Sequence, residues 1–430
     1  MPTGSAASSP RGLVLSPFRA LRYTARDAAA LARLTSPAYD LIGAEDLAAL
    51  ERIDPHNVVR LILPRAEPGD GDGRYRRAAH TLARWRADGV LAADPRPALY
   101  VYEMTDGSVS TRGLVGAVGL RPPEAGVILP HEDTMLGPVL DRLALTEATE
   151  ANFEPIVLVY DGSGRASEVV HRQVSAPALL SIVGADGVTH RIWPVTDPQM
   201  LRDVAADLAE HTAVIADGHH RYASYLRHQQ RRHADGGGAG PWDRGLAYLV
   251  ATGAHGPQVQ AIHRLLPGLD LDTALQGAAR VMRTRRVDIT PDGAAGLLAA
   301  HPDSAYLLTD GRQWHLLSQP DPAAVGRAVD AGRSAAWRGL DVTIAHHLLI
   351  RSVWGVPDDE HGVAFGHDVP STLSALRRGG VALLLRPTQA DSVLRVARAG
   401  ERMPRKSTLF VPKPRNGLLL RAYADEASEL

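Results

Sequence analysis

The stretch TAVIADGHHRYASYLRHQQRRH, residues 212–233, joins an apolar segment, a glycine turn and a helical pattern. TAVIA has the composition of a buried strand, and the residues from His219 onward have apolar side chains at helical spacing. Asp217 is a favourable N-cap residue, and Gly218 permits a sharp turn. The stretch therefore predicts a strand that ends in a tight turn at the N-terminus of a helix.

Polar side chains crowd this predicted turn. The unpaired amide groups and the dipole of a helix N-terminus favour an anion. Arg221 has a planar group suited to phosphate oxygens, and His219 and His220 can donate to the same anion or transfer a proton. We therefore expect Gly218 and Arg221 to bind a phosphate, with Asp217 and both histidines as catalytic candidates. A solvated helix end is the alternative interpretation.

The residues Gly-His-His-Arg at 218–221 resemble the G-x-x-R turn of the ParB and sulfiredoxin-like fold, in which that turn binds nucleotide phosphates. Some members of that superfamily are small-molecule kinases, including a free-serine kinase. The resemblance implies a ParB-like, nucleotide-binding module around this turn.

Six blocks along the chain also resemble one family of bacterial and archaeal proteins, in the order of that family. They are SPFRALRY (16–23), SPAYDLI (36–42), DPHNVVRLILP (54–64), LPHEDTMLGPVLDRLAL (129–145), IADGHHRY (215–222) and ERMPRKSTLFVPKPRNGLLL (401–420). The chain is identified as a member of this uncharacterised family, domain of unknown function 1015. Arg405 and Leu409 depart from the glutamine and the aromatic residue expected there. The family resemblance implies a set of enzyme-like polar blocks. The genes of some family members lie near serine-biosynthesis genes.

The block LPHEDT places several polar side chains before a predicted helix over 135–150. Glu132 is our candidate general base for a substrate hydroxyl, and His131 would orient it. We expect His131, Thr134 and Arg142 to contact substrate. Helix capping by solvated charges is the alternative.

The block RMPRKSTLFVPKPR contains Arg402, Arg405, Lys406, Lys413 and Arg415. Cations next to hydroxyl groups can hold phosphate, so we predict phosphate contacts from three adjacent residues, Lys406, Ser407 and Thr408. The glycine spacing of a Walker A loop is absent. A basic surface loop that binds nothing is the alternative.

Composition limits the remaining possibilities. The 430 residues have a formal net charge of -1 and contain no cysteine, which excludes disulfides, thiolate zinc sites and cysteine nucleophiles. The sequence has neither a signal-peptide pattern nor an apolar run long enough for a membrane span. We expect a cytoplasmic protein that does not bind membranes, is unlikely to bind nucleic acid, and has an oligomeric state that its sequence leaves open.

The expected fold class is α+β (mixed α/β), with multi-strand mixed sheets and packed helices. Strands are predicted at 58–64, 97–105, 112–120, 155–161, 246–252 and 380–388, and helices at 75–91, 135–150 and 199–211. The expected domains are a disordered tail (1–12), an N-terminal α/β domain (13–198), a ParB-like phosphate-binding module (199–268), a C-terminal α/β domain (269–380) and a C-terminal block returning to the site (381–425).

These features favour a small-molecule phosphotransferase with a nucleotide or pyrophosphate as donor. Glu132 or Asp217 would deprotonate the acceptor, a small hydroxyl compound with L-serine as the candidate by resemblance. Magnesium would bridge phosphate oxygens, with Asp217 as a possible ligand. One alternative is a nucleotide-binding regulatory protein related to ParB and associated with DNA through the basic residues at 227–233. Another is a hydrolase that uses the two histidines, for which the sequence provides no nucleophile.

Overall fold

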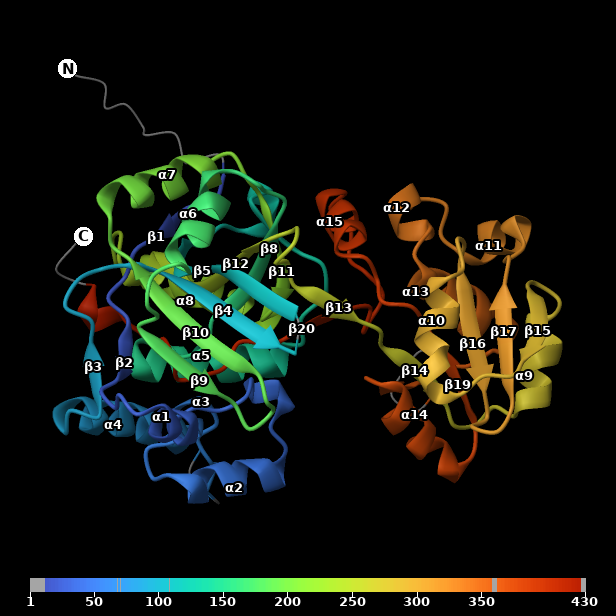
Figure 1. Ribbon diagram of the computed structural model, residues 1–430, viewed down its shortest axis with the longest axis horizontal. Helices are drawn as coiled ribbons and strands as arrows, with labels where there is room; N and C mark the ends of the chain where they lie inside the picture. Colours follow the sequence, from blue (N-terminus) through green and yellow to red (C-terminus); the bar gives the residue numbers. More distant parts are fainter. Residues whose placement is uncertain (1–11, 68, 70, 108, 358–361, 427–430) are drawn as a thin grey trace. The chain divides into compact units, whose positions relative to one another are not determined.

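The computed structural model describes residues 12–67, 69, 71–107, 109–357 and 362–426 (Figure 1). It contains two compact units. The first consists of Met1–Pro257 and Pro412–Leu430, and the second, Gln258–Val411, is inserted between these two segments. Of the tail predicted at 1–12, only Gly12 lies within the described residues.

A nine-stranded mixed sheet forms the centre of the first unit. Its neighbouring strands are, in order, β6 (Ile128–Pro130), β11 (Ala213–Asp217), β8 (Ile156–Tyr160), β12 (Arg244–Ala251), β5 (Val109–Gly119), β4 (Leu99–Asp106), β10 (Thr189–Val195) and β9 (Leu180–Val183), and β1 (Leu15–Ser16) pairs with β5.

The strand directions determine which strands end at the same edge of this sheet. Strand β11 is parallel to β6 and antiparallel to β8, whereas β8 is parallel to β12. The carboxyl ends of β6 and β11 therefore lie at one end of the sheet. The carboxyl ends of β8 and β12 lie at the other.

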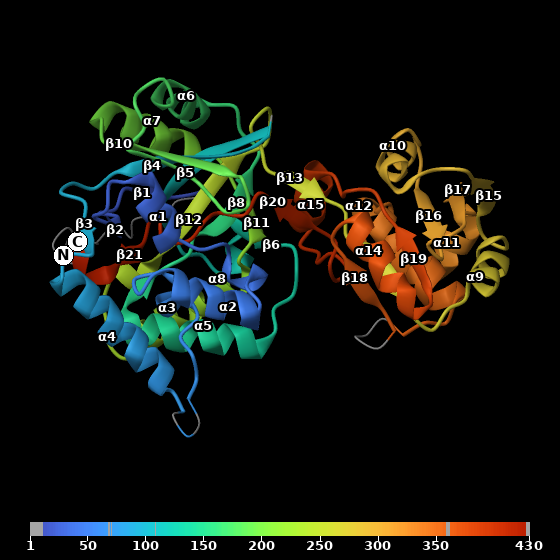
Figure 2. The same cartoon turned by 60° about the horizontal axis from the view of Figure 1, so that its bottom comes forward.

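Helices cover both faces of the sheet (Figure 2). Helices α6 (Arg165–Gln173) and α7 (Pro198–Leu208) pack their apolar side chains on one face, against residues such as Leu158 and Ile215. Helices α4 (Gly73–Ala87), α5 (Leu136–Thr149) and α8 (His219–Ala234) lie on the other. Because β8 is covered on both faces, all five of its residues are buried, which explains its uninterrupted apolar sequence.

Smaller elements complete the first unit. They are α1 (Ala28–Leu34), α2 (Ala44–Ile53), α3 (Val59–Ile62), and the short pairs of β2 (Leu21–Tyr23) with β3 (Leu91–Ala93) and of β7 (Ala151–Asn152) with β21 (Arg421–Ala422).

The prediction of a strand at 58–64 was wrong, because this segment contains helix α3. Val59, Leu61 and Ile62 are all buried, and a short buried apolar run has no periodicity that separates a strand from a helix. The side chain of Asn57 accepts the backbone amide of Val59 at 3.0 Å and donates to the carbonyl of Arg33 at 2.7 Å. These bonds fix the turn at which the helix begins.

The second unit has a six-stranded antiparallel sheet and its own core, which includes Leu307, Leu316 and Leu384. Its strands are, in order, β15 (Arg283–Val287), β17 (Trp314–Ser318), β16 (Ala305–Thr309), β19 (Val381–Leu384), β14 (His263–Leu266) and β18 (Ala364–Gly366), and β13 (Gln258–Gln260) pairs separately with β20 (Leu409–Val411). Its helices are α9 (Leu271–Ala278), α10 (Ala294–Ala299), α11 (Pro322–Ala328), α12 (Ala335–Arg338), α13 (Asp341–Ile344), α14 (Val369–Ala375) and α15 (Ala390–Arg398), with a π-helix at Ala345–Val353.

The predicted class, a mixed α/β protein with multi-strand mixed sheets and packed helices, is confirmed. The division into units differs from the one expected from sequence. Strands β11 and β12, assigned to a module at 199–268, share one sheet with β4 and β5. The chain leaves this unit after Pro257 and returns at Pro412, so the block predicted at 381–425 is divided between the two units.

The returning segment is anchored by Arg421, whose side chain is fully buried. Its guanidinium binds the carboxylate of Glu426 at 2.6 and 2.7 Å and also donates to the Asn152 side chain and two backbone carbonyls. We expect Arg421→Met to lower the free energy of unfolding of the first unit by about 3–5 kcal/mol, because Glu426 keeps a buried, uncompensated charge. Urea denaturation should show this loss, whereas Arg202→Met on the exposed side of α7 should cost about 0.5 kcal/mol or less. Equal effects of the two changes would contradict the prediction.

Candidate functional site

The parallel pairing of β6 with β11 brings together two polar motifs that are distant in sequence. Pro130 is the register partner of Ile215, so the HEDT motif at 131–134 and the GHHR turn at 218–221 both begin at the same end of the sheet. The rings of His131 and His219 are in contact, with centroids 4.6 Å apart. The sequence singled out both motifs, but only the strand pairing makes them neighbours.

Three histidines hold the 131–135 loop against the start of α8. His131, fully buried, donates from Nδ1 to the carbonyl of Ile215 at 2.6 Å. The backbone amide of His131 donates to Nε2 of His219 at 3.4 Å, and that of Met135 donates to Nε2 of His220 at 3.1 Å. The Nε2 atoms of both helix histidines are therefore acceptors of backbone bonds, which gives these side chains a positioning role.

Glu132 is an acidic side chain of this loop that lies close to His131. Its Oε1 lies 3.8 Å from Nε2 of His131, and 31% of its side chain is exposed. Thr134, the next candidate along the loop, is exposed. Glu132 is thus accessible to a substrate while remaining beside a fixed imidazole.

Gly218 makes the turn between β11 and α8. Its φ is 92°, in the left-handed region that favours glycine, and it occupies the N-cap position of α8. A Cβ here would lie 3.0 Å from Ile156 Cγ2 and 3.1 Å from the guanidinium of Arg221. The turn therefore requires glycine for its backbone and for the space beside it.

Asp217 does not cap this helix, so that prediction was wrong. Its Oδ2 accepts from Arg221 at 2.5 Å, and its Oδ1 lies 2.8 Å from Nζ of Lys413. Lys413 also binds the carboxylate of Asp40, and its side chain is only 9% exposed. Burial acts to raise the pKa of Asp217, but the charges of Arg221 and Lys413 outweigh it and hold that pKa below its ordinary value.

Arg221, which we expected to bind a phosphate, is buried. Its side chain is 7% exposed and donates to the carbonyl of Pro155 at 2.6 Å as well as to Asp217. The guanidinium also lies over the ring of Tyr39, 5.7 Å from its centroid. Removal of the Arg221 side chain would therefore lower the stability of the fold as well as weaken the binding of a nearby anion.

A second carboxylate, Glu154, extends the network and was missed by the sequence analysis. It accepts from the side chain of Asn416 at 2.7 Å and from the amide of Tyr39 at 3.3 Å, and its Oε2 lies 3.8 Å from Arg142. A charged residue two positions before the apolar strand β8 was the available signal.

Arg142, predicted to contact substrate, is buried and bonded to protein groups. It donates to the carbonyl of Ile62 at 2.8 Å and pairs with Asp141. This placement, like the burial of His131, favours a supporting role for both residues.

The three predicted phosphate contacts of the C-terminal block lie in the second unit. Ser407 is buried and donates from its hydroxyl to the carbonyl of Pro404 at 2.5 Å. The carbonyl of Lys406, a residue with φ of 52°, accepts from Arg264 at 2.9 Å. A single cleft that includes Lys406, Ser407 and Thr408 stays a prediction. The part of the block that meets Asp217 within the first unit is the segment with Lys413 and Asn416.

A magnesium ion does not fit Asp217 as this residue is arranged. Both carboxylate oxygens are bound by cations, and a metal ligand would have to lose at least one of them. Within the part of the chain that the structure describes, no group of three or more histidine or acidic side chains could hold a metal.

Comparisons with known proteins support the family assignment. The family described as a protein of unknown function, DUF1015, matches residues 15–343. The chain belongs to this family. A search of curated proteins found no match. No helix among the described residues is long and apolar enough to cross a membrane.

Three solved structures show remote similarity. A free serine kinase mutant in complex with ADP is 11% identical over 66% of this chain and 84% of its own, with a TM-score of 0.32. A conserved hypothetical protein from Pyrococcus furiosus is 12% identical over 66% and 88%, with a TM-score of 0.31. SbnI from Staphylococcus aureus, truncated at its C-terminus, is 12% identical over 71% and 81%, with a TM-score of 0.32.

The depressed pKa of Asp217 predicts a pH-dependent contribution to stability. The contribution is complete above the ordinary pKa of 3.8 and is lost as the pH falls through the lower folded-state pKa. Asp217→Asn should therefore lower the free energy of unfolding at neutral pH and make its decline below pH 3.8 shallower, by up to about 1.4 kcal/mol per pH unit. Urea denaturation across this range measures both effects. The exposed Asp235→Asn is the control, and its stability–pH profile should run parallel to that of wild type. A parallel profile for Asp217→Asn as well would show that the Asp217 carboxylate has no such role.

Proposed function

We propose that this protein is a small-molecule phosphotransferase whose donor, a nucleotide or pyrophosphate, binds at residues 218–221. One observation carries the proposal. The HEDT motif, the glycine turn and Lys413 meet at the same end of one sheet, although they come from distant parts of the chain. A proton acceptor, a helix N-terminus and a cation are the groups that phosphoryl transfer needs in one place.

The donor end of the proposed site is the start of α8. This helix is 16 residues long, and the positive end of its dipole coincides with the left-handed turn at Gly218. Lys413 adds a cation beside the turn, and its pKa is raised because the attraction of Asp217 and Asp40 outweighs the effect of burial. It therefore stays charged over the physiological pH range.

The acceptor end of the proposed site is Glu132. Its carboxylate would take the proton of the acceptor hydroxyl while the new oxygen–phosphorus bond forms and the bond to the donor's leaving oxygen breaks. We propose a small hydroxyl compound as acceptor, with L-serine first because the GHHR turn resembles that of the ParB-like kinases. Any magnesium ion that accompanies the donor would be held by phosphate oxygens rather than by Asp217 as arranged here.

The regulatory, DNA-associated alternative depends on the basic residues at 227–233. Arg231 pairs with Glu147 at 2.8 Å and Arg232 with Glu150 at 3.1 Å, whereas Arg227 is exposed. His228 is buried. The two pairings reduce the positive charge that this helix end offers to a nucleic-acid phosphate backbone and so favour the phosphotransferase proposal.

Glu132→Gln should separate binding from transfer. An amide keeps the shape of the side chain but accepts no proton, so we expect turnover to fall by about 10²–10⁴-fold while donor affinity changes little. Phosphate transfer to L-serine and other hydroxyl compounds would be followed by ³¹P NMR, and donor binding by calorimetry. Asp133→Asn, next in the chain and exposed, is the matched control. Full activity of Glu132→Gln would remove this residue from the mechanism.

Two lysines of the C-terminal block can be compared directly. Lys413→Met removes the cation beside Asp217 and leaves that carboxylate to repel a phosphate, so we expect donor affinity to fall at least about tenfold. Lys406→Met tests the residue favoured by sequence. A large loss of donor affinity in Lys406→Met, with no loss in Lys413→Met, would place the phosphate site in the second unit instead.

A further inference from the structure

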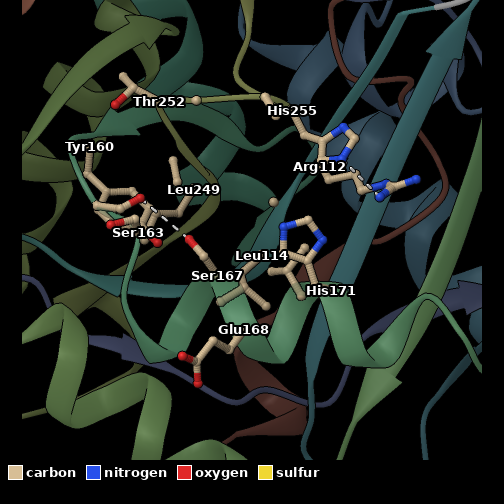
Figure 3. A pocket seen from close by; sticks show the side chains of 16 residues that line it. Arg112, Leu114, Tyr160, Ser163, Ser167, Glu168, His171, Leu249, Thr252 and His255 are labelled. Atoms are coloured by element: carbon tan, nitrogen blue, oxygen red, sulfur yellow. Dashed lines mark hydrogen bonds between the residues drawn. The ribbon is translucent and has the colours of Figure 1, made fainter.

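A separate cavity lies at the opposite end of the large sheet from residues 217–221. It has a volume of about 230 Å³ and lies where β8 and β12 end and α6 begins. Figure 3 shows the side chains around it, among them Arg112 of β5, Tyr160, Ser167 and His255. The proposed function uses none of these residues.

The cavity has a positive charge on its wall. Arg112 lines the cavity and binds the buried carboxylate of Glu103, which also pairs with Arg191 outside the lining. Glu168 also lines the cavity, but it is exposed, and in Figure 3 its carboxylate points away from Arg112. Arg112 is therefore the guanidinium that an anion in the cavity would meet.

His255 fixes the orientation of Arg112. Its Nδ1 lies 3.3 Å from the carbonyl of Ser110, which can only accept, so this nitrogen carries the proton. Its Nε2 then accepts from NH1 of Arg112 at 3.2 Å. With its Nε atom bound to Glu103, the guanidinium has NH2 as the remaining group for a ligand. The ring of His171 packs against that of His255, with centroids 5.5 Å apart.

Hydroxyl groups supply further donors to the cavity. Burial raises the pKa of Tyr160, which keeps its phenol protonated, and its hydroxyl bonds to that of Ser167. Ser163 and Thr252 also line the wall. The N-terminus of α6 offers fewer amide donors to a ligand, because the amide of Ala166 already donates to the carboxylate of Asp207 at 2.9 Å.

We propose that this cavity is a second binding site, for a small oxyanion with the shape of phosphate or a short carboxylate. A fixed arginine and several hydroxyl donors recognise such groups, and the volume is below that of sites for larger ligands. The site is distinct from the proposed active site. Arg221 binds the carbonyl of Pro155 just before β8 begins, whereas Tyr160 ends β8, roughly 15 Å away along the strand.

An oxyanion here would connect α6 to the segment that leads to the second unit. Thr252 and His255 belong to the loop after β12, and the second unit begins at Gln258. A ligand held between Arg112, Thr252 and Ser163 would order this loop without contacting residues 217–221.

Crystals of the full chain soaked in tungstate, a heavy analogue of phosphate, test this inference. We expect an anomalous peak in the cavity beside Arg112 in wild type. Calorimetry with inorganic phosphate should show about tenfold or greater loss of affinity at this site in Arg112→Gln, and a smaller loss in Thr252→Val, which keeps the shape of the side chain.

Lys413→Met is the control, because Lys413 does not line the cavity, and this change should leave the cavity peak unchanged. The inference is overturned if wild type shows no peak in the cavity, or if the peak persists in Arg112→Gln and so reflects an adventitious ion. Occupancy at residues 218–221 is scored independently, so the two sites can fail separately.

Discussion

The arrangement of the first unit depends on one carboxylate, that of Asp217, held between Lys413 and Arg221. Removing these charges from water costs several kcal/mol per ion, and only close pairing offsets that cost. The pairing therefore fixes the C-terminal segment, the start of α8 and the Asp40 turn together. A change in any one of them leaves a buried charge without its partner.

The same network joins polar residues from four of the family blocks. Asp40, His131, Asp217 and Lys413 each come from a different block, and each bonds within the first unit at the same end of the sheet. The last block is divided at Pro412 between the two units. Its first half contributes to the inserted unit, and its second half supplies Lys413 and Asn416 to the network.

Local pattern was sufficient to predict several of the longer elements of the first unit and the strand–glycine–helix turn. Strand β11, Gly218 and helix α8 occur where the spacing of apolar residues and the glycine placed them. The partner of Asp217 could not be predicted in this way. A cap at the next helix is the local solution for an aspartate, whereas Lys413 lies 196 positions further along and reaches it only because the chain returns after the insertion. The burial of Arg142 and Arg221 was missed for the same reason, since nothing in the adjacent sequence identifies Glu154 as their acidic neighbour.

The central claim is that the start of α8 and Lys413 form a phosphate site, with Glu132 beside it. The most direct measurement is a crystal structure of the full chain with bound pyrophosphate or nucleotide. The account predicts a phosphate group at the N-terminus of α8, within hydrogen-bonding distance of the turn at Gly218 and near Nζ of Lys413. A donor bound only elsewhere, with the pairing of Lys413 and Asp217 intact and residues 218–221 empty, would contradict it.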